Sequence, residues 1–287
     1  MMSDRSIRFP HLGITFDRVG DHIDLFGFPV MYYGIVIACG MLLAGLFILR
    51  EGKRQGLREE DLLDIVLWGI VCGVIGARVY YVLFSLDAYR GRWLSVFNLR
   101  EGGLAIYGGF IGGVLAVAVC CKKKGLSFWR VADIAVMGGV IGQICGRWGN
   151  FFNREAFGAY TDSLFAMQLP LSSVRQPGAV TEEMRQHIVS EGGMEWIQVH
   201  PTFLYEALWN CGVFLVLYCF VRPRKRWDGQ VFFSYLMLYG AGRLWIEGLR
   251  TDQLILFGTG LPVSQCLAGC FIVLAVGVLS YQRLRGR

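Results

Sequence analysis

The chain has 287 residues, of which 54% are hydrophobic and 17% charged, and it carries a formal net charge of +6. Its hydrophobic residues come in long runs, which excludes an ordinary soluble domain. The charges lie mostly between those runs, and no basic helix with interleaved aromatic residues suggests binding to nucleic acid. We therefore expect an integral membrane protein.

The runs are long enough to be membrane spans. A bilayer core requires about 20 consecutive apolar residues in a helix. Six runs reach that length, and a shorter glycine-rich run forms either a short fourth span or a tilted or re-entrant piece. The residues before the first run lack the pattern of a removed signal peptide, so we expect the first span to direct insertion. The expected spans are 30–49, 62–85, 102–121, 131–146, 199–221, 229–248 and 261–282.

Lysine and arginine in the connections indicate the orientation. With the N-terminus outside, the inner segments hold 15 of these residues in 33 positions, and the outer segments hold 11 in 109 positions. All five lysines are on the inner side. The predicted fold is an all-α integral membrane protein with about seven transmembrane helices, N-out and C-in, as a single polytopic domain. The connection 147–198 is long enough to form a small extracytoplasmic lobe.

Four charged residues within the expected spans are candidates for a site, because each charge costs about 2.5 to 3.5 kcal/mol at a helix centre. They are Arg78, Glu206, Arg243 and Glu247, and the topology places all of them in the outer half of the membrane. Arg78 alone is equally consistent with a side chain that snorkels to the interface. Arg243, Glu247 and Arg250 share one helix face, which suits a site or a structural ion pair.

The densest polar segment follows the fourth run and reads GRWGNFFNREAFG at 146–158. Arg147 offers a guanidinium that can hold a phosphate through two hydrogen bonds. Asn150 and Asn153 can donate to phosphate or glycerol oxygens, and Glu155 and Gly158 complete the segment. At the depth of lipid headgroups this segment suits an anionic phospholipid, although a chance interfacial turn is the alternative.

Two tyrosines and a histidine lie at the same side of the predicted membrane. Tyr33 opens the first span and Tyr107 the third, and tyrosine is common at bilayer interfaces in any membrane protein. His200 lies at the start of the fifth span, about 9 Å above Glu206 at 1.5 Å per residue. The nine cysteines lie in or beside apolar runs without a CxxC pattern or a histidine at ligand spacing, so we expect no metal site and no cofactor.

The whole pattern resembles the bacterial prolipoprotein diacylglyceryl transferases. The segment 146–158 looks like the signature of that family, and the likeness extends over nearly the whole chain. The other matching places, in order, are Tyr33-Gly34, 76–81, 102–109, His200-Pro201-Thr202 with Tyr205-Glu206, and Gly242-Arg243 with Glu247.

This resemblance implies a transferase of the bacterial inner membrane whose site faces the outer leaflet. It would move the diacylglyceryl group of phosphatidylglycerol to the lipobox cysteine of a prolipoprotein, forming a thioether and releasing glycerol phosphate. Arg147 and Arg243 would hold the phosphate, which is electrostatic stabilisation in a water-poor site. Asn150, Glu155, Gly158, Tyr33 and Glu247 would shape the pocket, with Asn153, Arg78 and His200 beside it.

One position departs from the family pattern, since many members have histidine where Tyr107 stands. That histidine is the assigned base for the thiol, and a tyrosine with a pKa near 10 is a poor base. We therefore expect Tyr107 to orient a headgroup or thiol, and the base to be Glu206, His200 or the field of the arginines.

Two other functions remain as alternatives. A CDP-alcohol phosphotransferase would need paired aspartates around a metal, and the aspartates of this chain are not clustered in that way. A phospholipid transporter or scramblase would need polar residues across the whole membrane, whereas these residues stop in the outer half.

Overall fold

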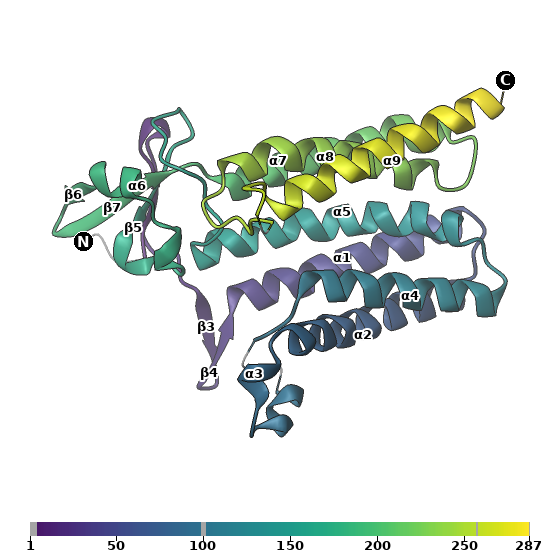
Figure 1. The fold of residues 1–287 in the computed structure, drawn as a ribbon, viewed down its shortest axis with the longest axis horizontal. Coiled ribbons are helices and arrows are strands. Elements are labelled where there is room, and N and C mark those ends of the chain that lie inside the picture. Colours follow the sequence, from purple (N-terminus) through teal and green to yellow (C-terminus); the bar gives the residue numbers. More distant parts are fainter. Residues whose placement is uncertain (1–4, 99–101, 257, 287) are drawn as a thin grey trace. The chain divides into compact units, whose positions relative to one another are not determined.

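The computed structural model describes residues 5–98, 102–256 and 258–286, and these are mostly helical (Figure 1). Among them, six helices are long and apolar enough to cross a membrane. They are α1 (Tyr32–Arg54), α2 (Glu59–Phe84), α4 (Ile106–Lys124), α5 (Phe128–Asn153), Thr202–Arg224, which begins with α7 (Thr202–Val216), and α9 (Val263–Arg285). A seventh long helix, α8 (Gln230–Leu249), is less apolar because it carries Arg243 and Glu247. Two short helices are α3 (Leu86–Tyr89) and α6 (Glu182–Gln186).

Every predicted span corresponds to a helix, but the fourth one differs in length. The prediction ended it at residue 146, where the polar segment begins, whereas α5 continues to Asn153. Its 26 residues correspond to about 39 Å at 1.5 Å per residue, so it is long enough to cross a membrane. Arg147 and Asn150 therefore lie on the last two turns of a helix rather than in a loop, because their side chains find polar partners there.

The described residues are mostly helical, as expected, and they also form two antiparallel sheets that the sequence did not predict. The larger has the strand order β2-β1-β5-β7-β6 and the smaller is the hairpin β3-β4. Short strands separated by turns give little periodic signal, which explains why the sequence did not reveal them. The strands are β1 (Ile7–Phe9), β2 (Ile14–Phe16), β3 (His22–Leu25), β4 (Phe28–Met31), β5 (Met167–Pro170), β6 (Val189–Glu191) and β7 (Met194–Val199).

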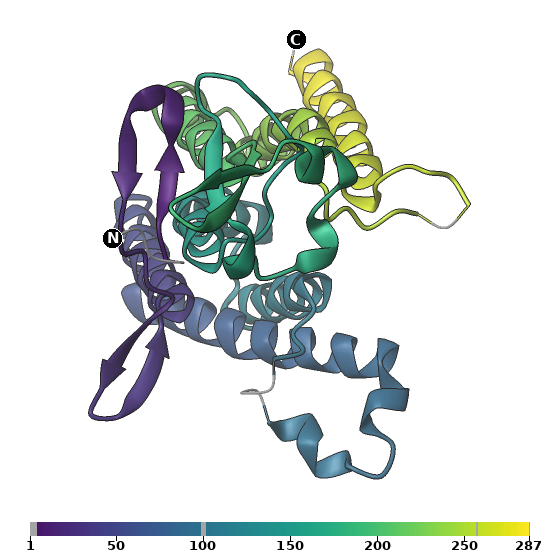
Figure 2. The ribbon, with the colours of Figure 1, turned by 90° about the vertical axis from the view of Figure 1, so that its left-hand side faces the viewer.

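The larger sheet joins the N-terminus to the segment that follows α5. Arg8 of β1 pairs with Gln168 of β5, and β5 pairs along its length with β7. In Figure 2 the purple N-terminal strands accordingly run beside the green segment. The buried core of the sheet includes Phe151 from the end of α5 and Phe203 from the start of α7. The sheet thus holds those two helix ends together.

The chain divides into two compact units, each described by itself. The first comprises Met1–Ala44 and Val136–Arg287, and the second is Gly45–Ala135. In the first unit α8 packs against α7 and α9 (Figure 1). In the second, α2 packs closely against α4. The helices are so close that a Cβ on Gly112 would lie 2.2 Å from the carbonyl oxygen of Cys72. Small residues permit such contact between helices in lipid.

Candidate functional site

The carboxylate of Glu206 on α7 is the centre of a buried charge cluster in the first unit. Its Oε2 lies 3.1 Å from Nε of Arg147 on α5 and 3.0 Å from Nη1 of Arg243 on α8. Its Oε1 lies 3.7 Å from Nη1 of Arg250, which follows α8. Glu206 is only 3% exposed. Three helices therefore meet through one carboxylate.

Close packing of α7 and α8 makes these contacts possible. The indole of Trp209 on α7 lies over Gly242, where a Cβ would come within 2.3 Å of Nε1. That Nε1 donates a hydrogen bond to the carbonyl oxygen of Leu238 at 3.0 Å. Gly242 immediately precedes Arg243, so the same approach of the helices brings the Arg243 guanidinium to Glu206.

Two further carboxylates balance the arginines. Arg243 forms an ion pair with Glu247 one turn along α8. Arg250 donates from Nε and Nη2 to the two oxygens of Asp252, at 2.9 and 2.8 Å. The cluster thus contains three arginines and three carboxylates, and its formal charge is zero. Arg243 and Glu247 on α8 and Arg250 just after it therefore belong to an ion-pair network, and that network is part of the larger cluster.

Arg147 has donors to spare. Among the described residues its contact with a carboxylate is made through Nε alone, and its side chain is 20% exposed. Arg243 uses both terminal nitrogens and Arg250 uses all three guanidinium nitrogens. The terminal nitrogens of Arg147 can thus bind an incoming anion without breaking a contact.

The two asparagines of the polar segment face its own glutamate. Asn150 and Asn153 each donate from Nδ2 to Oε1 of Glu155, at 3.2 and 3.0 Å. Oε2 of Glu155 lies 3.4 Å from Nε of Arg175. Sequence reasoning missed Arg175, because it is 20 positions away in the lobe. This second, smaller cluster stabilises the turn that ends α5.

Gly158 stands where three segments converge. Its N–H donates to the carbonyl oxygen of His200 at 3.0 Å, and it forms an isolated bridge with Arg250. A Cβ at this position would lie 2.8 Å from the Cβ of His200 and from the carbonyl oxygen of Leu249. Only glycine fits here without displacing its neighbours. Gly158 thus joins the polar segment to the start of α7 and to the end of α8.

Tyr33 and His200 border the clusters. The ring of Tyr33 lies on Gly149, where a Cβ would approach it to 2.6 Å, so this glycine accommodates a tyrosine of the chain itself. Nδ1 of His200 is 3.2 Å from the hydroxyl oxygen of Tyr205. Burial lowers the pKa of His200 below its usual range, which keeps its imidazole neutral at pH 7.

Arg78 and Tyr107 belong to the second unit. Arg78 is buried and donates to five backbone carbonyls of the segment after α2. Its guanidinium has five N–H groups, so none is left for a phosphate, and it does not snorkel to an interface. We therefore withdraw Arg78 from the proposed substrate contacts. Tyr107 is the second residue of α4. The acceptors of Arg78 are the carbonyls of Ser95, Val96, Asn98, Gly102 and Gly103.

Neutral polar residues extend the site and were also missed. Gln143 is one turn before Arg147 on α5, and its Nε2 donates to the Tyr235 hydroxyl at 2.8 Å. Asn210 is one turn after Glu206 on α7 and is 2% exposed. Both residues are uncharged and so do not stand out within an apolar span. The signal in the sequence is their spacing, since Gln143 is four positions before Arg147 and Asn210 is four positions after Glu206.

Comparisons with known proteins agree on one family. The family model described as prolipoprotein diacylglyceryl transferase matches residues 22–281. A protein of Clostridioides difficile is 43% identical over 240 residues, covering 84% of this chain and 86% of its own length. One of Bacillus cereus is 39% identical over 272 residues, covering 94% of each. One of Listeria welshimeri is 37% identical over 263 residues, covering 92% and 89%. All three are named phosphatidylglycerol--prolipoprotein diacylglyceryl transferase.

Proposed function

Because the chain belongs to the prolipoprotein diacylglyceryl transferase family, we propose that it transfers the diacylglyceryl group of phosphatidylglycerol to a prolipoprotein. The acceptor is the thiol of the lipobox cysteine. A carbon–sulfur bond forms as the bond between the glyceryl carbon and the phosphate oxygen breaks, and glycerol phosphate leaves with the electron pair. The observation that best supports this reaction is the arginine cluster around Glu206.

In this proposal Arg147 is the direct ligand of the phosphate. Its terminal nitrogens are available, and negative charge increases on the leaving phosphate in the transition state. A donor aimed at such charge in a water-poor site stabilises the transition state more than the ground state. Arg243 and Arg250 are balanced by Glu247 and Asp252, and Glu206 positions all three guanidinium groups.

We assign the acceptance of the thiol proton to His200 rather than to Glu206. Both oxygens of Glu206 already contact arginines, so its function is to hold them in place. His200 has a neutral imidazole and is only partly buried. The guanidinium group of Arg147 favours the thiolate of the acceptor, which eases the transfer.

The topology we propose has seven spans, counting α8 as the sixth along the chain, with the N-terminus outside and the C-terminus inside. The last turns of α1, α4 and α9 all carry lysine or arginine, which suits the cytoplasmic side of a bacterial inner membrane. The cluster around Glu206 then lies toward the outer leaflet. The lobe 147–198, together with the N-terminal strands, lies outside the cytoplasm.

The test is to incubate the purified protein with phosphatidylglycerol and a lipobox peptide and to measure the peptide mass. We expect the added mass of a diacylglyceryl group. Arg147→Ala should insert normally but lose transfer by about 100-fold or more, the usual effect of removing one donor to developing charge. Arg147→Lys should recover part of the rate, since lysine keeps the charge but not the planar fork.

Arg185→Ala on α6 is the matched control, because this arginine is exposed. It should transfer at the wild-type rate. A wild-type protein that adds no mass but moves phospholipid between leaflets would favour the transporter or scramblase instead.

A further inference from the structure

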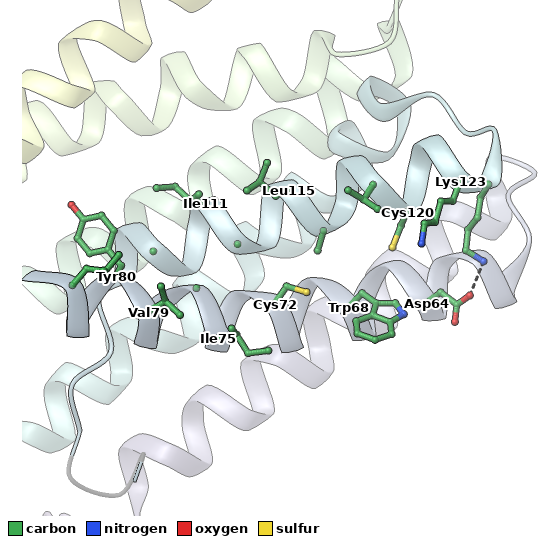
Figure 3. A pocket seen from close by; sticks show the side chains of 17 residues that line it. Asp64, Trp68, Cys72, Ile75, Val79, Tyr80, Ile111, Leu115, Cys120 and Lys123 are labelled. Carbon is green, nitrogen blue, oxygen red and sulfur yellow. Dashed lines mark ion pairs between the residues drawn. The ribbon is translucent and has the colours of Figure 1, made fainter. Parts of the chain in front are cut away.

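A long apolar groove in the second unit has no part in the proposed transfer. It runs between α2 and α4 and has a volume of about 920 Å³ (Figure 3). Glycines form part of its floor, where the two helices are closest, and Trp68, Ile75 and Leu115 stand along its sides. The glycines are Gly76, Gly108 and Gly112.

The groove is long and almost wholly apolar. From Asp64 to Leu83 it extends over 19 residues of α2, or about 28 Å at 1.5 Å per residue. Apolar side chains and glycines form its walls over nearly all of this length. It therefore suits an extended hydrocarbon chain.

The charge at one end selects the headgroup. Lys124 pairs with Asp61 at 2.8 Å and with Asp64 at 2.6 Å, so its charge is compensated (Figure 3 draws the pair with Asp64). Lys123 lines the groove beside it, and Lys122 precedes it. In the described part of the chain neither Lys122 nor Lys123 has an ion-pair partner. The ammonium group of Lys123 thus stands at the end of the apolar groove, and exposed Lys122 adds positive charge to the same end of α4.

We propose that this groove binds an anionic phospholipid, with one acyl chain between α2 and α4 and the phosphate at Lys123, next to Lys122. Under the proposed topology the lipid belongs to the cytoplasmic leaflet. The apolar helix of a signal peptide is the competing occupant. The basic residues that precede such a helix would be repelled by the lysines.

Photolabelling can test this site. The full-length protein is mixed with phosphatidylserine or phosphatidylcholine carrying the same diazirine acyl chain, and labelled peptides are mapped by mass spectrometry. Phosphatidylserine should label peptides of α2 and α4 far more than phosphatidylcholine does. Each basic residue near an anionic lipid contributes a factor of about five. Lys123→Gln should thus reduce labelling about fivefold, and Lys122→Gln/Lys123→Gln about 25-fold.

Lys53→Gln/Arg54→Gln at the end of α1 is the matched control, because it also removes two positive charges. Its labelling and that of the wild type should be equal. Equal labelling by the two lipids, or no loss in the lysine variants, would overturn the proposal. Competition by a lipobox peptide would assign the groove to the acceptor instead. The transfer assay is separate, since the wild type can fail to transfer and still be labelled here.

Discussion

Glu206 shows how a charge can be retained inside a helix bundle. An isolated carboxylate at this depth would be costly, and the guanidinium groups of Arg147, Arg243 and Arg250 offset that cost. Each partner comes from a different part of the chain. The cluster is neutral as a whole, so a phospholipid phosphate adds negative charge that the spare nitrogens of Arg147 can bind.

A substitution at Gly158 tests how closely the polar segment packs against the start of α7 and the end of α8 beside that cluster. Gly158→Ala places a Cβ 2.8 Å from the Cβ of His200 and from the Leu249 carbonyl oxygen, so those segments must shift. We expect a loss of about 1 to 3 kcal/mol in the free energy of unfolding, as for other overpacked sites. The loss should appear as a lower Tm in detergent, together with slower transfer.

Gly178→Ala is the control for this variant, since a Cβ there has no neighbour within 4 Å. It should leave the Tm unchanged or raise it slightly. A Gly158→Ala protein as stable and as active as the control would show that the space around Gly158 is open.

His200 predicts a pH dependence. Its pKa is lowered by burial in the folded protein, so the unfolded chain binds a proton more readily. The free energy of unfolding is therefore highest, as far as His200 is concerned, above about pH 6.5, the ordinary histidine pKa. It decreases as the pH falls from that value toward the lowered pKa of the folded protein. As the proposed base His200 also loses function when protonated, so transfer should decline over the same range.

The measurement is the transfer rate and the Tm from pH 8 to pH 5, for the wild type and for His200→Gln. The variant should be slow at all pH values, and its residual rate should no longer follow the decline below pH 6.5. A variant with the same profile as the wild type would exclude His200 as the base.

Among the elements, α2 and α4 are joined by backbone contact rather than by large side chains. Gly112→Ala would place a Cβ 2.2 Å from the Cys72 carbonyl oxygen, which only separation of the helices can relieve. We expect a loss of about 1 to 3 kcal/mol in stability. Thermal unfolding in detergent would measure it.

Gly139→Ala on α5 is the comparison, because its Cβ has no neighbour within 4 Å and alanine favours a helix by about 1 kcal/mol. This variant should be as stable as the wild type or more so. If both variants have the same Tm, close packing of α2 and α4 contributes nothing to stability.

For the whole molecule the topology makes a prediction that does not depend on the site. Alkaline phosphatase is active only outside the cytoplasm, so a fusion after Gly178 should be active and a fusion after Gly125 inactive. A fluorescent protein at the C-terminus should fold inside the cell. The reverse pattern would overturn the proposed orientation and with it the outer-leaflet site.

Hydropathy was sufficient to predict seven long helices, because the length of an apolar run is a local property. The polar segment 146–158 and the charged residues of α7 and α8 were also visible in the sequence. The end of α5 at Asn153 was not, since a helix continues through polar residues when their side chains have partners.

Tertiary packing decided which of those residues act together. Glu206 gathers arginines from α5, α8 and the segment after α8, and Arg78 donates to backbone carbonyls in the second unit instead. β1 pairs with β5 across about 160 positions. Hydropathy and spacing describe neighbours along the chain, whereas ion pairs and strand ladders depend on which segments the fold brings into contact.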